Sequence, residues 1–145
     1  MSTPYESANL ILKIFEMRRE PLLREARTWF LREFHPNSGA ELLALSPDQN
    51  RMLRMVTGYW DMACSLVNHG AIDRQMFIDA NGEIFGTFSK VQPYLGDVRQ
   101  ALNLPEWLKH TEQVVMSIPG VEGRLEAIRN RLRGIAAAQQ AAAKP

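Results

Sequence analysis

The sequence predicts an all-α fold, an irregular multi-helix bundle of about five to seven helices with a long C-terminal amphipathic helix. Three observations carry this prediction. Apolar residues recur at intervals of three and four along most of the chain, helix-capping residues precede these segments, and no window alternates apolar and polar residues over a strand's length. A chain of 145 residues is long enough to bury one hydrophobic core.

The first two helices are predicted on either side of Pro21. Thr3-Pro4-Tyr5-Glu6 forms a capping box, in which the two polar side chains satisfy each other's backbone amides. This helix should extend to about Arg19, because proline disfavours helical geometry in the residue before it. A helical period resumes after Pro21, and the turn formers "HPNSG" (35–39) then indicate a loop, followed by a short turn in "AELLAL".

The strongest helical pattern opens at a second capping box, Ser46-Pro47-Asp48-Gln49. It closes at His69-Gly70, where glycine supplies the left-handed residue that ends helices. Asp73 is a good N-cap for a further helix as far as Ala80. The apolar residues of the strong pattern are Met52, Leu53, Val56, Tyr59, Trp60, Ala63 and Val67.

Beyond Ala80 the helical pattern passes straight through a proline. Apolar residues recur from Ile84 to Leu102 despite Pro93, which predicts one kinked helix or two nearly collinear ones. Another helix is predicted to start at Leu104-Pro105-Glu106-Trp107, and Ser117-Ile118-Pro119-Gly120 then breaks the chain.

The last helix carries the seam of a coiled coil, with apolar residues at alternating steps of four and three. These residues are Val121, Leu125, Ile128, Leu132 and Ile135. We therefore expect a bundle over 1–119, a C-terminal amphipathic helix over 120–140 that packs on the bundle or on a partner chain, and a disordered low-complexity tail over 141–145.

Composition and charge exclude several classes of protein. The net charge of +1 gives no field that would attract nucleic acid or an anionic membrane. No run of about 18 to 20 uncharged apolar residues predicts a membrane span, and the N-terminal sequence lacks the pattern of a signal peptide. The single cysteine, Cys64, excludes an internal disulfide, and we expect a cytoplasmic protein.

The segment "IDANGEIFGTFSK" (78–90) is similar to the start of a calcium loop, because Asp79, Asn81 and Glu83 stand two residues apart. Such a loop also needs glycine at its sixth position and glutamate at its twelfth. This chain has Ile84 and Lys90 there. We therefore interpret the segment as a joint between two helices.

No other pattern predicts a metal, a cofactor or catalysis. The candidate ligands Asp61, Cys64, His69 and Asp73 lack the spacing that aims two side chains at one metal. No Gly-x-Ser-x-Gly elbow or phosphate-binding loop occurs. The C-terminal arginines flank the apolar seam on both sides, as in a pairing helix, instead of forming one basic stripe; they are Arg124, Arg129, Arg131 and Arg133.

The middle of the chain nevertheless resembles a family of uncharacterised bacterial helical domains, from about Ile11 to Val115. The resemblance rests on "RTWFLREF", "YWDMACSLVNHGAIDRQMF" and "QPYLGDVRQ". It implies an all-helical fold without an assigned activity, and many relatives carry an N-terminal transmembrane helix that has no counterpart here. The positions that match are Trp60, Asp61, Leu66, Val67, Gly70, Ile72, Asp73 and Arg99. We expect Asp61 and Arg99 to pair across two helices.

These observations favour a soluble protein-protein interaction or scaffolding domain without catalytic activity, which self-associates through the seam of the last helix. The alternative is a small-molecule-binding or enzymatic bundle with a pocket near Trp60, His69 and Asp73. A third interpretation is nucleic-acid binding through the C-terminal arginines. The candidate ligand-binding residues are Trp60, Asp61, His69, Asp73 and Arg99.

Overall fold

Local capping signals determine where the main helices begin. The computed structural model describes residues 1–145 and consists of nine α-helices, one 3-10 helix and no strand. Both predicted capping boxes form, at the starts of α1 and α4. The elements are α1 (Pro4–Met17), α2 (Pro21–Arg32), α3 (Gly39–Leu43), α4 (Pro47–Asn68), α5 (Arg74–Ala80), α6 (Glu83–Val91), η1 (Gln92–Tyr94), α7 (Leu95–Leu102), α8 (Lys109–Met116) and α9 (Val121–Ala143).

The all-α fold class is confirmed, but the helices are more numerous than the five to seven predicted. The turn predicted at "AELLAL" is a helix of its own, α3, and the 3-10 turn at Pro93 separates α6 from α7. The start predicted for α8 at Leu104 is also wrong. Residues 104–108 are turns, and Leu108 has a left-handed φ of 58°, so the helix begins only at Lys109.

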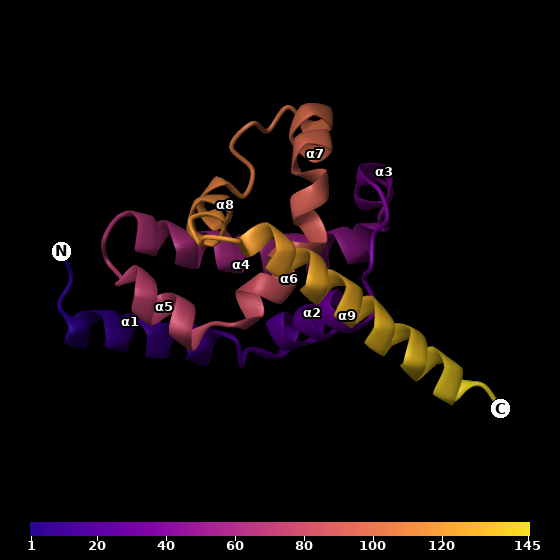
Figure 1. Cartoon of the computed structure of the whole chain (residues 1–145), viewed down its shortest axis with the longest axis horizontal. Coiled ribbons are helices and arrows are strands. Elements are labelled where there is room, and N and C mark those ends of the chain that lie inside the picture. The colour runs from indigo at the N-terminus through magenta and orange to yellow at the C-terminus, as the bar shows by residue number, and fades with distance from the viewer.

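Helix α4 lies at the centre of the molecule, with α2 and α8 packed against it (Figure 1). The core is one cluster of 29 buried hydrophobic residues to which every α-helix contributes. Its largest fully buried side chains are Trp60, Phe30, Phe77, Phe85 and Phe88. Even the short helices α3 and α5 supply core residues, so the elements from α1 to the start of α9 share one hydrophobic core.

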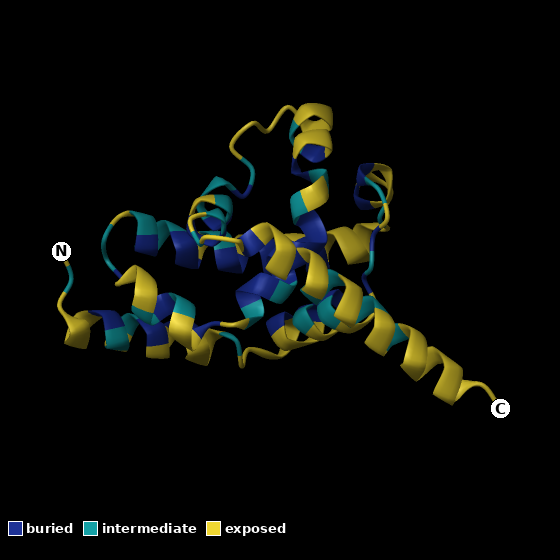
Figure 2. Cartoon of the chain, viewed as in Figure 1, coloured by how far each residue is buried: buried dark blue, intermediate teal, exposed yellow.

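Helix α9 has two unlike halves. Its first turns pack on α6, where Val121 and Leu125 are buried, whereas its last turns extend away from the bundle to the C-terminus (Figures 1 and 2). The helix continues to Ala143, into the segment for which the sequence predicts a disordered tail. None of the helices, α9 included, combines the length and the apolar composition needed to cross a membrane.

Candidate functional site

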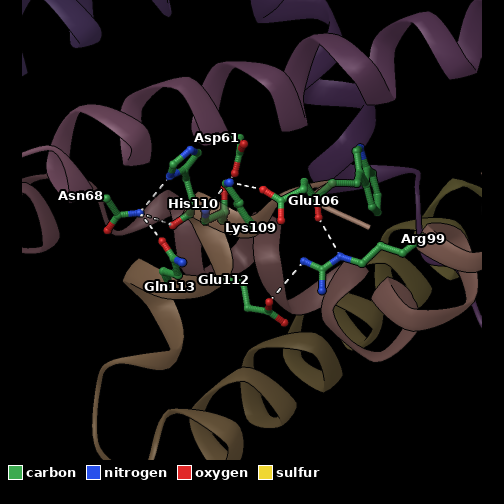
Figure 3. A network of polar contacts seen from close by, with 10 residues as sticks. Asp61, Asn68, Arg99, Glu106, Lys109, His110, Glu112 and Gln113 are labelled. Carbon is green, nitrogen blue, oxygen red and sulfur yellow. Dashed lines mark hydrogen bonds and ion pairs between the residues drawn. The ribbon is translucent and has the colours of Figure 1, made fainter. Parts of the chain in front are cut away.

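The carboxylate of Asp61, on α4, caps the start of α8. Its Oδ1 accepts hydrogen bonds from the backbone N–H of Thr111, at 2.8 Å, and from the Thr111 hydroxyl, at 3.0 Å. Helix α8 needs this outside acceptor because its own N-cap residue, Leu108, has no side-chain oxygen. Asp61, a candidate ligand-binding residue, thus holds two helices together (Figure 3).

The pair predicted between Asp61 and Arg99 does not form. Arg99 donates from Nε to the carbonyl of Trp107, at 2.9 Å, and from an Nη to Glu112, at 3.2 Å. Figure 3 shows the Arg99 side chain directed to these two partners, on the side of α8 away from Asp61. The prediction failed because Asp61 and Arg99 each bind residues of α8 or of the turn before it. The start of α8 was predicted five residues too early, so these partners could not be foreseen.

Asn68 forms a second polar junction between α4 and α8. Its Nδ2 donates to Gln113 Oε1, at 3.1 Å, and lies 3.1 Å from Nδ1 of His110 (Figure 3). The predicted candidate His69 is adjacent, with its ring 5.8 Å from that of His110 and its Nδ1 2.8 Å from the carbonyl of Ser65. Both imidazoles therefore use Nδ1 in helix-end contacts, and neither is paired with a nucleophile.

The remaining candidates, Trp60 and Asp73, also have structural roles. Trp60 is completely buried, and its ring packs edge-on against Tyr59 and Phe77. Asp73 is the predicted N-cap of α5, since its Oδ1 accepts from Met76 N–H at 2.8 Å. The structure thus brings Asp61, His69 and Asn68 to one side of the α4–α8 junction, but it does not gather Trp60, His69 and Asp73 around one cavity.

The calcium-like segment is a joint between α5 and α6. Glu83, the first residue of α6, binds Arg27 through Oε1 to Nε at 2.7 Å and through Oε2 to Nη2 at 2.5 Å, and its Oε2 also binds Arg18 at 2.5 Å. Asn81 is buried and donates to the carbonyl of Phe77. The Glu83 oxygens are thus already engaged, and no group of three or more His, Cys, Asp or Glu side chains could hold a metal ion anywhere in the chain.

Lys90, at the end of α6, caps the C-terminus of α2. Its Nζ donates to the carbonyls of Phe30, Leu31 and Phe34 at 2.6, 2.9 and 2.7 Å. The negative end of the helix dipole favours a cation there. Lys90 is only 1% exposed, and burial lowers its pKa to about 7, with a further contribution from the charge of Arg133. The residue that excludes calcium from this segment is therefore a clamp between α6 and α2.

The C-terminal arginines hold α9 on the bundle. Arg129 donates to the carbonyl of Ser89 at 2.6 Å, and Arg133 donates to the carbonyl of Pro36 at 2.7 Å. The guanidinium of Arg124 lies 3.9 Å from the centre of the Phe85 ring. Only Arg131 among the four has no such contact within the chain, which does not favour the interpretation of this helix as a nucleic-acid interface.

A largely apolar hollow lies between α3, the start of α4, α7 and the turns before α8. It has a volume of about 720 Å³, and eight of its eleven lining residues are hydrophobic. We call it the leucine groove. It is lined by Leu42, Leu43, Leu45, Pro47, Asn50, Leu53, Arg54, Val98, Leu102, Leu104 and Trp107.

A more polar hollow of about 610 Å³ adjoins the leucine groove on the surface of α4. Asp61, Glu106 and His110 line it, and Arg54 and Trp107 line both hollows. Arg54 is exposed and forms no hydrogen bond or ion pair, unlike Arg51 one turn earlier, which pairs with Asp48 at 2.9 Å. Arg54 is thus a free cation at the boundary between an apolar and a polar surface.

Comparison with known families gives a match over most of this architecture. Residues 5–117 match the family described as "Domain of unknown function (DUF4760)". The chain belongs to this family. No curated protein and no solved structure matches it. The DUF4760 match contains α1 to α8 and ends before the first residue of α9.

The groove of this DUF4760 domain was missed by sequence reasoning. Five of its six leucines come from two short segments, "AELLAL" and "ALNLPEWL", for which the sequence predicts only a turn and parts of helices. The only local signal is the number of leucines in these two segments, and it does not show which of them remain exposed. Three of these side chains remain substantially exposed, namely Leu43 at 43%, Leu102 at 52% and Leu104 at 48%.

Proposed function

We propose that this chain is a non-catalytic protein-interaction domain that associates with a second copy of itself through the C-terminal half of α9. The observation that carries the proposal is the extension of α9 beyond its last anchoring contact, that of Arg133 with Pro36. Residues 134–143 continue the helix away from the bundle (Figure 2). We call these residues the α9 arm.

A free helical arm of this length is unstable in isolation. The arm has ten residues, about 15 Å at about 1.5 Å of rise per residue, which is fewer than the roughly 12 to 15 residues that a helix on its own needs in water. Helix formation is favoured where a second surface covers it. Association would therefore stabilise the arm as well as join the chains.

The arm offers only part of the seam that the sequence predicts. Val121 and Leu125 are buried against the bundle, and Leu132 lies beside Gly86 and Leu31. Ile135 remains 48% exposed and is the first seam residue available to a partner. Because the following residues are mostly alanine and glutamine, the contact area is small, and we expect a weak dimer that forms at high protein concentration.

The test is the dependence of molar mass on protein concentration, measured by light scattering for two matched variants. Ile135→Glu places a charge on the seam, whereas Ala137→Glu places the same charge about 200° around the same helix. We expect dimerisation to be lost in the first variant and retained in the second. Equal masses for both variants, or a monomeric wild-type chain at every concentration, would refute the proposal.

Two other features support a non-catalytic role in the cytoplasm. Burial raises the pKa of the Cys64 thiol to about 12, so this free cysteine is protonated and unreactive at neutral pH. The polar residues around α8 are engaged with helix ends, as described for Asp61 and Asn68. A single unpaired cysteine is also typical of proteins in a reducing compartment.

A further inference from the structure

We propose that the leucine groove is a binding site for an anionic amphiphile, a molecule with an unbranched aliphatic chain and a carboxylate head. The chain would lie among the leucines, and Arg54 would bind the head. This site is separate from the α9 arm, and it does not depend on self-association.

The apolar lining of the groove is the reason to expect an aliphatic chain in the ligand. Pockets that bury small ligands have volumes of about 300 to 1,000 Å³ and mostly apolar walls with a few polar groups. The groove fits this description, with a volume of about 720 Å³ and only Asn50 and Arg54 as polar side chains besides its apolar walls. Leu102 and Leu104 remain about half exposed at its edge, at 52% and 48%. Covering them would remove apolar surface from water.

The exposed guanidinium of Arg54 is the reason to expect a negatively charged head group in the ligand. This guanidinium is always charged and offers a fork of donors that matches a carboxylate. Within this chain it has no acidic partner and no hydrogen bond, although its neighbour Arg51 is paired with Asp48. Because Arg54 lines both the groove and the adjoining polar hollow, a ligand whose chain fills the groove would leave its head beside this cation. The carboxylates of the polar hollow already have partners, because Asp61 accepts from Thr111 and Glu106 pairs with Lys109, so Arg54 is the charge there that is left to choose the head.

The shape of the groove favours a small ligand over a partner helix. A helix with its side chains is about 10 to 12 Å across and needs a trough that is open along its length. Here α3 and α7 stand up from the bundle next to each other, and the segment 103–108 connects α7 to α8 (Figure 1). The groove is also more enclosed than the polar hollow beside Asp61.

Dodecanoate below its micellar concentration is the probe, and Trp107 is the built-in reporter. The other two tryptophans, Trp29 and Trp60, are buried at 8% and 0% exposure, so a change in tryptophan emission reports mainly on the groove. We expect saturable binding of one dodecanoate per chain. Affinity should rise roughly fourfold for each methylene added between octanoate and dodecanoate, which corresponds to about 0.8 kcal/mol. Circular dichroism checks that helicity is unchanged.

One comparison of ligands and two comparisons of variants distinguish binding at this specific site from nonspecific adsorption to the protein surface. Dodecylamine, with the same chain and a cationic head, should bind at least about tenfold more weakly than dodecanoate. Arg54→Gln should abolish this preference, whereas Arg51→Gln, one turn away and outside the groove, should keep it. Leu102→Asp, at an exposed position, should remove binding of both ligands without unfolding the chain.

The proposal is overturned if dodecanoate does not saturate, if both heads bind equally to the wild-type chain, or if Leu102→Asp leaves binding intact. It is also overturned if no amphiphile binds while Leu102→Asp changes the molar mass in solution, because the groove would then be a protein contact. Loss of dimerisation in Ile135→Glu with dodecanoate binding retained would leave this inference standing.

Discussion

The two halves of α9 differ in what holds them, although both belong to one continuous helix. The first half has two buried aliphatic side chains, Val121 and Leu125, and two arginines that bind backbone carbonyls of the bundle. The arm after Arg133 has Ile135, then alanines and glutamines that face water. An evenly spaced apolar seam can thus serve folding at one end and remain available for association at the other.

The same contrast separates structural from available cations across the molecule. Lys90 is buried with three carbonyl partners, and Arg129 and Arg133 each bind one, whereas Arg54 is exposed with none. A cationic side chain with its hydrogen-bond partners inside the chain joins the segments that it contacts. A charge without partners beside an apolar groove is free to bind another molecule.

The largest effect is expected at Leu125, in the anchored half. Leu125→Ala should lower the free energy of unfolding by about 3 kcal/mol, because the side chain is completely buried and its loss leaves a cavity. The control is Ile135→Ala in the arm, which should change stability by less than about 0.5 kcal/mol. Urea unfolding measures both, and similar losses in the two variants would contradict the division of α9 into two parts.

Lys90→Met should cost about 2 kcal/mol near pH 8, since the carbonyls of Phe30, Leu31 and Phe34, at the end of α2 and just after it, lose the donor that α6 supplies. A variant as stable as the wild type would show that the clamp between α6 and α2 contributes nothing.

The pH dependence of stability tests the same lysine. Its pKa is lowered to about 7 in the folded chain from an ordinary value of 10.5, so above pH 7 the unfolded state binds more protons than the folded state. The free energy of unfolding should therefore rise between pH 7 and 8.5. Above about pH 9 burial of Cys64, whose pKa is raised to about 12, acts in the opposite direction. In Lys90→Met the rise below pH 8.5 should be absent, and an unchanged rise would assign it to another group.

Asp61 is expected to have a smaller effect, that of a helix cap. Asp61→Ala should lower the free energy of unfolding by about 1 kcal/mol, because the Thr111 amide and hydroxyl both lose their acceptor. Asp61→Asn should cost less, since the amide oxygen can still accept from Thr111. Equal losses in the two variants, measured by urea unfolding, would indicate that the charge matters more than the acceptor.

Signals confined to a few residues could be predicted from the sequence, and contacts between distant segments could not. The capping box of Thr3 and Glu6, the left-handed Gly70 and the N-cap Asp73 all act within about one turn, and each forms as predicted. The contacts of Lys90 have no local signal in the sequence, because its partners lie 56 to 60 residues away along the chain.

The candidate site follows the same rule. The sequence predicts Asp61 as a ligand-binding candidate paired with Arg99, whereas its partner in the structure is Thr111, which lies 50 residues away along the chain. The leucine groove combines four segments whose leucines each look like ordinary helix-end residues. No local pattern states which of these leucines remain uncovered, since that depends on how α3 and α7 pack.

The smallest effect on stability is expected when the arm is removed. A chain that stops after Arg133 keeps every anchoring contact, so its free energy of unfolding should stay within about 0.5 kcal/mol of the full chain. A chain that stops at Gly120 would instead lose Val121 and Leu125 from the core. Instability of the longer truncation would show that the arm contributes to the fold.

Sedimentation equilibrium of the full chain and of the chain ending at Arg133 tests the central claim most directly. The full chain should pass from its monomer mass of 16.5 kDa towards twice that value as its concentration rises, and the shortened chain should remain a monomer throughout. The same mass for both proteins at every concentration would contradict the assignment of the α9 arm to self-association.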